Sequence, residues 1–289
     1  MDKTLELINV KKSYEKFDLE VSFDIEPGYI MGFIGPNGAG KTTTIKLIMN
    51  LAKKNSGKIN IFGKDNVDFE EEVKQDIGFV YDEPVFYDRL PIKKMTNIYK
   101  PFYKNWDEEK YQKFLQIFEL DEEKKISTLS KGTKMKYALA LALAHNPKLV
   151  IMDEPTAGLD PVIRREILQI LQEIVAKYET TIFFSTHLTS DLDKIADYIT
   201  FINDGSIVFS KEKDMILDEY HLVKGGNYYL NDEVIKSFIG YKKTDFGFEA
   251  LSKNTGYGDS VIIERPTLED IMYYHNKKAL MGGELLWHL

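Results

Sequence analysis

The feature that most constrains this chain is a glycine-rich run that joins an apolar segment to a helix-forming one. Residues 35–43 read Gly-Pro-Asn-Gly-Ala-Gly-Lys-Thr-Thr and fit the pattern G-x-x-x-x-G-K-[ST]. The apolar run 31–34 precedes them, and the residues from 42 to about 51 predict a helix. Glycines let several backbone N–H groups face one anion, and a helix N-terminus adds partial positive charge. The run therefore predicts a site for the phosphate groups of a nucleotide.

The alternative to a phosphate site is a glycine-rich turn that has a lysine beside it by chance. At ordinary amino-acid usage the bare pattern arises in about 1% of chains of this length. The apolar run before it and the helix after it favour nucleotide binding over chance. Lys41 is expected to reach the β- and γ-phosphates, and the Thr42 hydroxyl is expected to bind Mg²⁺. The predicted nucleotide-binding residues of this loop are Gly35, Pro36, Asn37, Gly38, Ala39, Gly40, Lys41, Thr42 and Thr43.

Composition excludes several other classes of function. A net charge of −8 over 289 residues argues against unaided binding to nucleic acid or to an anionic bilayer. The absence of cysteine excludes disulfides and thiolate metal sites and fits a cytoplasmic location. The longest apolar candidate, 137–144, is far short of the roughly 20 residues that cross a bilayer. The N-terminus does not resemble a signal peptide, so any action at a membrane is expected to pass through another polypeptide.

The first part of the chain predicts an α/β fold. Residues 5–10 and 17–25 alternate apolar and polar side chains, which is typical of half-buried antiparallel strands. The runs 77–81, 149–152 and 180–185 are almost unbroken in their apolar character, which indicates buried strands of a parallel sheet. These patterns predict a P-loop NTPase core with an antiparallel β subdomain.

Two further segments differ from this core in the spacing of their apolar residues. Between about 84 and 145, helical spacing replaces alternation, and an inserted helical subdomain is expected there; one helix face is formed by Tyr111, Phe114, Leu115 and Phe118. Residues 1–212 are assigned to the ATPase domain and 213–289 to a small C-terminal α+β appendage, with a strand at 261–264 and a helix at 268–277. The apolar tail 281–289 is expected to fray, with docking on a partner as the alternative.

Candidate catalytic residues lie at the ends of the predicted buried strands. Asp153 and Glu154 follow one such strand, where unpaired charge is costly unless a cation or ligand accompanies it. Asp153 suits Mg²⁺, and Glu154 suits a base that polarises water. His187 ends the next strand and is a candidate sensor of the γ-phosphate. The other four histidines, namely His145, His221, His275 and His288, are expected to be structural.

Three more residues complete the set of candidates. Ser130 is a favourable N-cap for a helix that runs to about 144, and the N–H groups behind it form a second anion site. Asp160 is followed by Pro161, a combination typical of a helix start. Tyr14 lies between the first two strands and offers a ring on which a purine can stack. Ordinary core or surface packing is the alternative for this tyrosine.

Taken in order, these motifs resemble those of the nucleotide-binding subunits of ABC transporters, over about residues 3–212. Tyr14 matches the adenine-stacking aromatic and residues 35–43 match the Walker A loop. Residues 129–133 match the LSGGQ signature in the form Leu-Ser-Lys-Gly-Thr. Residues 149–154 match Walker B with its catalytic glutamate, 157–160 match the D-loop, and His187 matches the switch histidine.

The resemblance implies an activity, cofactors and partners. Such subunits bind two ATP molecules with Mg²⁺ between two copies, so that Ser130 and Gly132 of one copy face the Walker A and B residues of the other, with Asp160 nearby. Glu154, His187 and Lys41 are the implied catalytic residues. The implied partners are separate transmembrane permease subunits and an identical or different second ATPase, on the inner face of the cell membrane. No nucleic-acid partner is expected.

The chain departs from the family pattern at two motifs. Asp82-Glu83 stands where the Q-loop glutamine is expected, and either carboxylate could reach Mg²⁺ through water, with Asp82 named as the candidate metal ligand. A carboxylate cannot donate a hydrogen bond as an amide does, so the coupling role of this loop is open. Lys131 and Thr133 replace Gly and Gln of the signature. The single ATPase domain, the short acidic Q-loop and the appendage resemble the ATPases of small Gram-positive exporters, including exporters of antimicrobial or amphipathic peptides.

Two alternatives are weighed against a transporter subunit. A soluble ABC ATPase acting on nucleic acid, on ribosomes or in cluster assembly is disfavoured, because translation factors of this superfamily carry two tandem ATPase domains. Chromosome-maintenance ATPases place a long coiled coil between the Walker motifs, and this chain has none between Lys41 and Asp153. A regulatory pseudo-ATPase is disfavoured by the presence of Glu154 and His187. The interpretation that the sequence favours is an exporter ATPase.

Overall fold

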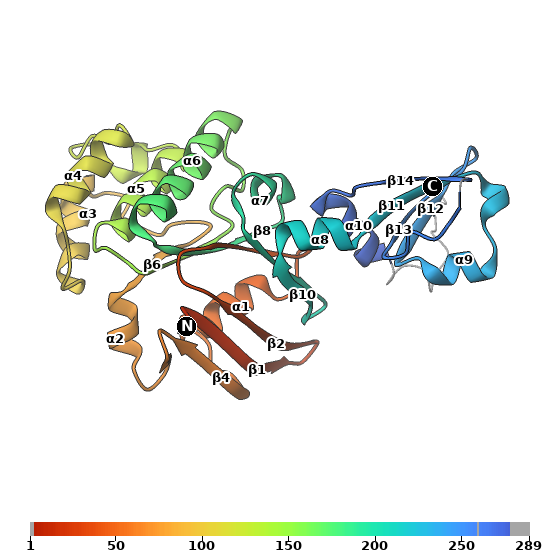
Figure 1. The fold of residues 1–289 in the computed structure, drawn as a ribbon. Coiled ribbons are helices and arrows are strands. Elements are labelled where there is room, and N and C mark those ends of the chain that lie inside the picture. Colours follow the sequence, from red (N-terminus) through yellow and green to blue (C-terminus); the bar gives the residue numbers. More distant parts are fainter. Residues whose placement is uncertain (1–2, 259, 278–289) are drawn as a thin grey trace. The chain divides into compact units, whose positions relative to one another are not determined.

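The computed structural model describes residues 3–258 and 260–277, which fall into two compact units that meet between Ser210 and Lys211. Figure 1 shows the elements of both units in order along the chain. The expected boundary after residue 212 lies within this junction region. The expectation for the tail 281–289, and that for His288, fall outside the described residues. Within the described ranges, none of the helices combines the length and the apolar character needed to cross a membrane.

The first unit is built on one ten-stranded sheet in the order β5-β4-β1-β2-β10-β9-β3-β8-β7-β6. Its antiparallel part comprises β1 (Leu5–Tyr14), β2 (Phe17–Ile25), β4 (Ser56–Ile61) and β5 (Lys64–Asp65). Its parallel part comprises β3 (Ile30–Ile34), β6 (Ile77–Val80), β7 (Leu149–Asp153), β8 (Thr181–Thr186) and β9 (Tyr198–Asn203). β10 (Ser206–Glu212) neighbours β9 after a turn whose Asp204 and Gly205 have φ of 45° and 73°. Positive φ at both positions is the geometry of the predicted hairpin.

The parallel strands are short and apolar because helices cover both of their faces. Every residue of β3, β7 and β8 is buried. Figure 1 shows α1 (Lys41–Ile48) on one face of the sheet, and α5 (Lys131–Leu143), α6 (Pro161–Tyr178) and α7 (Thr189–Ile195) on the other. α1 is shorter than predicted because Asn50 adopts a left-handed conformation, with φ of 53°, that ends the helix. The short helix α2 (Glu70–Gln75) leads into β6.

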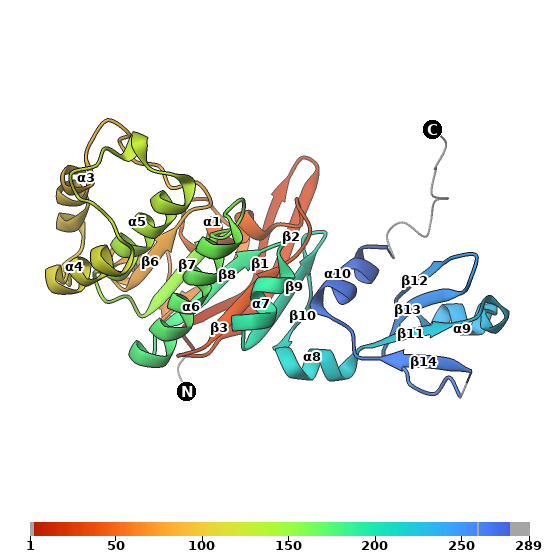
Figure 2. The same cartoon turned by 90° about the horizontal axis from the view of Figure 1, so that it is seen from above.

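The predicted helical subdomain is present between β6 and β7. It comprises α3 (Ile92–Tyr99), α4 (Glu108–Ile117) and α5, with 3₁₀ turns at Lys100–Phe102 and Ile126–Thr128. Figure 2 shows α3, α4 and α5 grouped together at one end of this unit. The apolar face predicted for α4 is confirmed, since its members are all buried: Tyr111, Phe114, Leu115 and Phe118. This subdomain presents α5 and its N-terminal end beside the sheet.

The second unit is the α+β appendage. It contains a four-stranded antiparallel sheet in the order β12-β13-β11-β14. Its strands are β11 (His221–Gly225), β12 (Gly240–Lys243), β13 (Phe248–Ser252) and β14 (Val261–Glu264), and its helices are α8 (Lys213–Glu219), α9 (Asp232–Ser237) and α10 (Leu268–Lys277). A separate core surrounds Val223, Phe238 and Phe248. The predicted strand 261–264 and helix 268–277 are confirmed.

Candidate nucleotide-binding site

A cavity of about 540 Å³ lies where the parallel strands of the first unit end. The loops that follow β3, β6, β7 and β8 all contribute to it, because the carboxyl ends of parallel strands meet at one edge of a sheet. Residues as far apart in the sequence as Phe17 and His187 are therefore brought to one place. The lining residues are Phe17, Asn37, Gly38, Gly40, Lys41, Thr42, Thr43, Asp82, Glu154, Ala157 and His187.

The loop after β3 has the backbone geometry that the glycine pattern predicts. Gly38 and Gly40 have φ of 82° and 113°, which other residues rarely adopt. A Cβ atom on Gly35 would lie 2.3 Å from the Ile202 carbonyl oxygen, so this position requires glycine. α1 begins at Lys41 with no side-chain cap and no acidic residue in its first turn. Its first N–H groups therefore remain available to an anion such as a phosphate group.

Lys41 connects the phosphate loop to the predicted base. Its Nζ atom donates to the Gly35 carbonyl oxygen at 2.8 Å and lies 3.3 Å from Glu154 Oε1. The lysine side chain is 6% exposed and the glutamate side chain 13% exposed. Burial of two charges is tolerated because each neutralises the other. Thr42 and Thr43 follow on α1 and line the same cavity.

Glu154 is held in place by the loop that follows β8. Its backbone has φ of 48°, and its N–H group donates to the Ser185 carbonyl oxygen at 3.0 Å. Its Oε2 atom accepts a hydrogen bond from the His187 N–H group at 3.2 Å and lies 2.8 Å from His187 Nδ1. The two residues predicted to be catalytic thus contact each other directly. This arrangement fixes the direction in which the carboxylate points.

Asp153 lies beneath the cavity and is 6% exposed. Its Oδ1 atom accepts a hydrogen bond of 2.6 Å from the Ser185 hydroxyl group. Sequence reasoning missed Ser185, although its position two residues before His187 at the end of the neighbouring strand was a usable signal. The pairing of β7 with β8 places Asp153 opposite Ser185 in register.

The donor set fits Mg²⁺ carried in by a nucleotide. The described residues contain no group of three or more carboxylate, imidazole or thiol side chains arranged to hold a metal on its own. Mg²⁺ at nucleotide sites takes only one or two protein carboxylates and otherwise uses phosphate oxygens and water. The Thr42 hydroxyl and the Asp82 carboxylate line the cavity, and Asp153 lies next to Glu154, which lines it. Asp82 Oδ1 is shielded from solvent and has no hydrogen-bond partner within the described part of the chain.

Asp82 lines the cavity and its neighbour Glu83 does not. Burial raises the pKa of the Asp82 carboxyl group above its ordinary value, and the negative charges of Asp153 and Glu154 add to this rise. The Lys131 ammonium group, which lies 3.7 Å from Asp82 Oδ1, acts in the opposite direction and lowers this pKa. Of the two acids at the Q-loop position, only Asp82 therefore has a carboxyl group that faces the cavity charges.

Eight of the predicted residues do not line the cavity: Gly35, Pro36 and Ala39 of the phosphate loop, Asp153 beneath the cavity, and Tyr14, Ser130, Gly132 and Asp160. The Ser130 hydroxyl caps α5 by accepting from the Thr133 N–H group, and Asp160 Oδ1 caps α6 by accepting from two N–H groups. Gly132 packs closely on α6, since a Cβ atom there would lie 2.6 Å from Ile163 Cδ1. Tyr14 is half-exposed with Lys12 Nζ over its ring at 5.1 Å. Its role in stacking stays a prediction.

Phe17 is the aromatic residue that lines the cavity, and sequence reasoning missed it. It pairs with Tyr14 across the β1–β2 hairpin. A Cβ atom on Gly40 would lie 3.1 Å from the Phe17 ring, so the ring packs directly against the phosphate loop. The signal available in the sequence was its position three residues after Tyr14.

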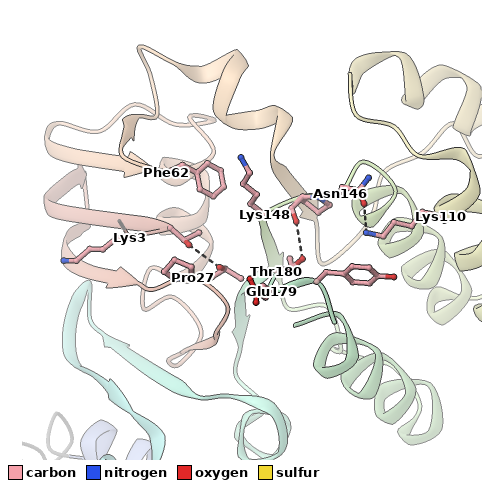
Figure 3. A pocket seen from close by; sticks show the side chains of 12 residues that line it. Lys3, Pro27, Phe62, Lys110, Asn146, Lys148, Glu179 and Thr180 are labelled. Atoms are coloured by element: carbon pink, nitrogen blue, oxygen red, sulfur yellow. Dashed lines mark hydrogen bonds between the residues drawn. The ribbon is translucent and has the colours of Figure 1, made fainter. Parts of the chain in front are cut away.

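A second cavity, of about 550 Å³, lies where the strands of the sheet begin (Figure 3). Lysines line it, but they already have partners. Lys110 Nζ donates to Asn146 Oδ1 at 2.9 Å, and Lys148 Nζ pairs with Asp76 at 2.7 Å. None of the predicted motifs contributes a residue to it. The phosphate-binding loop and the candidate catalytic residues are all at the opposite ends of the strands.

Fold and site together define a P-loop nucleoside triphosphatase. Comparison with known proteins narrows this class. Residues 19–157 match the family model described as ABC transporter. The bacitracin transport ATP-binding protein BcrA of Bacillus licheniformis is 33% identical over 208 residues, which are 71% of this chain and 68% of that protein.

Two more comparisons agree with this match. The lantibiotic transport ATP-binding protein SrtF of Streptococcus pyogenes is 32% identical over 214 residues, covering 73% of this chain and 91% of that protein. A solved ATP-binding subunit of an ABC transporter superposes with a TM-score of 0.67 at 29% identity, covering 74% of this chain and 91% of that structure.

The chain belongs to the family of ABC transporter ATP-binding proteins. It is an ATP hydrolase and the ATP-binding subunit of an ABC transporter, as the motifs predicted. The predicted α/β fold with a P-loop core is likewise confirmed.

Proposed function

We propose that this chain drives an exporter of antimicrobial or other amphipathic peptides whose membrane-spanning subunits are separate chains. The support for the cargo is that BcrA and SrtF are named for the transport of bacitracin and of a lantibiotic. The support for membrane subunits is that these relatives are named as the ATP-binding proteins of transport systems. Attachment to these permease subunits would hold the chain at the inner face of the cell membrane.

Phosphate groups are bound by the loop after β3 in this proposal. The Gly38 and Gly40 backbone and the uncapped start of α1 direct N–H groups to the β- and γ-phosphates, and Lys41 supplies a positive charge. Thr42, Asp153 and Asp82 supply the oxygen atoms for Mg²⁺. When bound, this ion would offset the negative charge that develops on the phosphate groups.

Hydrolysis is assigned to the pair formed by Glu154 and His187. Glu154 accepts a proton from water as the water oxygen bonds to the γ-phosphorus, and the bond from that phosphorus to the bridging oxygen of ADP breaks. His187 keeps the Glu154 carboxylate oriented through its N–H group and ring. The products are ADP and inorganic phosphate.

The observation that carries the proposal is the division of the motifs into two sets. Lys41, Asp82, Glu154 and His187 line one cavity, whereas Ser130 lies outside it with its hydroxyl exposed at the start of α5. This division supports a signature that serves the cavity of another molecule. We therefore infer a dimer, with an identical or a different ATPase, that closes over two ATP molecules.

Docking to the permease is assigned to the segment that joins β6 to the helical subdomain and to the surface of that subdomain. Val85, Tyr87 and Phe102 are 89%, 64% and 70% exposed. Large apolar side chains that are this exposed to solvent are typical of protein contact sites. Val85 and Tyr87 lie a few residues after Asp82 in the same connecting segment, so a partner bound there would sense the state of the ATP site.

The test is Glu154→Gln, which keeps the size of the side chain and removes its ability to take a proton. We expect ATP binding to persist, hydrolysis to fall about 10²- to 10⁴-fold, and a dimer to accumulate on gel filtration with ATP. Glu173→Gln on the exposed face of α6 is the matched control and should behave as wild type. A monomeric Glu154→Gln variant with unchanged hydrolysis would refute the assignment.

A further inference from the structure

Two of the residues at which this chain departs from the family motifs, one in each motif, form an ion pair. Asp82 replaces the expected glutamine and follows β6, and Lys131 replaces a glycine of the signature and begins α5. Lys131 Nζ lies 3.7 Å from Asp82 Oδ1. One ion pair therefore links the cavity-lining loop after β6 to the first residue of the signature helix.

The ion pair between Asp82 and Lys131 is weak. Its separation is longer than a hydrogen bond, and Asp82 Oδ1 has no hydrogen-bond partner in the described part of the chain. Although the Asp82 Oδ1 atom is itself shielded, the Asp82 and Lys131 side chains as wholes are 49% and 43% exposed, so nearby solvent weakens their attraction. A divalent ion in the cavity carries twice the charge of Lys131 and would compete for this carboxylate with advantage.

The Lys131 side chain also has room to move, beside Gly158. Its Nζ atom lies 3.4 Å from the position that a Cβ atom would take on Gly158, a residue of the D-loop with φ of 68°. Glycine at this position leaves room beside the ammonium group. The lysine therefore lies between the cavity-lining loop and the D-loop, and it can move away from Asp82 without displacing a side chain at Gly158.

We propose that Asp82 exchanges partners during the ATP cycle, pairing with Lys131 before nucleotide binds and turning to Mg²⁺ when Mg²⁺–ATP enters the cavity. Lys131 is then a positioning residue for the metal side of the site. Entry of Mg²⁺–ATP releases the start of α5, which carries Ser130, from the loop after β6. The inference rests on the Mg²⁺–ATP site proposed above.

Other ion pairs on α5 differ from this one and supply a control. Lys134 pairs with Asp88 at 3.2 Å and Lys136 pairs with Glu166 at 2.6 Å. None of these four residues lines the cavity. Lys134→Gln therefore removes a lysine of the same helix and a comparable ion pair without touching the metal side of the site.

The experiment measures the ATP affinity of the full-length chain by calorimetry, once with Mg²⁺ and once with EDTA. The ratio of these two affinities is the Mg²⁺-dependent gain. Lys131→Gln removes the competitor of Mg²⁺, so we expect the Mg²⁺-dependent gain in affinity to increase about two- to fivefold. Asp82→Asn should reduce this gain, and Lys134→Gln should leave it at the wild-type value. A gain in Lys131→Gln equal to that of wild type would overturn the exchange.

A charge swap separates a structural role from a role at the metal side. The double variant Asp82→Lys with Lys131→Asp rebuilds the ion pair, and we expect its midpoint of thermal unfolding to recover from the fall of about 1–3 °C caused by Lys131→Gln. Its Mg²⁺-dependent gain should stay low, since a cation now lines the cavity. A swapped variant with the full Mg²⁺ effect would overturn the exchange. A wild-type chain with no Mg²⁺ effect would instead refute the proposed metal site itself.

Discussion

A buried histidine at the joint between α5 and β6 predicts that acid will destabilise the first unit. His145 is fully buried just after the end of α5. Its Nε2 atom donates to the Ile77 carbonyl oxygen of β6 at 3.1 Å, and its ring stacks on Tyr103 with centroids 3.8 Å apart. Burial lowers the pKa of His145 from its ordinary value of 6.5 to about 4. The structural role predicted for this histidine is consistent with these contacts.

The sign and size of the effect follow from linkage between protonation and folding. The unfolded chain takes up a proton on this ring below about pH 6.5, whereas the folded chain resists it until about pH 4. The contribution to the free energy of unfolding is therefore fully present above pH 6.5 and is lost as the pH falls through this window. Full loss amounts to about 3 kcal/mol, and the part lost between pH 7 and pH 4.5 is about 2 kcal/mol.

The assay compares wild type with His145→Gln, whose amide can still donate to Ile77 but does not titrate. Urea unfolding is followed by the fluorescence of Trp106, which lies in the helical subdomain 5.2 Å from the Tyr111 ring. Trp287 is replaced by Phe in both proteins so that one tryptophan reports. Between pH 7 and pH 4.5 the wild type should lose about 2 kcal/mol more than the variant. Equal losses would refute the reasoning, as would an NMR titration of the folded chain that places the His145 pKa near 6.5.

Two shorter predictions test the nucleotide site and the docking surface. Lys41→Ala should abolish ATP binding in calorimetry, because the variant loses the cation that meets the phosphates; normal affinity would contradict the phosphate-loop assignment. Tyr87→Ser with Phe102→Ser should release the chain from its permease subunits in a membrane pull-down and leave basal ATP hydrolysis intact. Phe246→Ser, which changes a 98% exposed residue of the second unit, is its control, and persistent membrane attachment of the double variant would place the docking surface elsewhere.

The parts of the fold that could be predicted are those determined by neighbours in sequence. β2 begins and ends at Phe17 and Ile25 as its alternation predicted, because one face is buried and the other is not. The phosphate loop was equally predictable, since its glycines are required by local backbone geometry. The strands β11, β12 and β13 were missed because they do not alternate. β11 buries the adjacent Leu222 and Val223, and β12 is only four residues long with two lysines.

The parts of the site that could not be predicted depend on strand order. Ser185 bonds to Asp153 only because β8 lies beside β7, and Phe17 meets the phosphate loop only because β2 and β3 belong to one sheet. The choice between Asp82 and Glu83 likewise depends on how the chain leaves β6. Sequence patterns identified the residue types that carry the chemistry, but the order of the strands in the sheet determines which of these residues contact one another.

The contact between Lys41 and Glu154 joins substrate binding to preparation of the base. With the two side chains only 6% and 13% exposed, neither charge is stable there without a partner. A γ-phosphate that takes the Lys41 ammonium group removes the cation from Glu154 and places negative charge beside it. The carboxylate then keeps its contact with His187 and is free to accept a proton from water. In the proposed mechanism the same lysine serves both partners in turn, so that Glu154 becomes available to take a proton from water once the γ-phosphate has arrived.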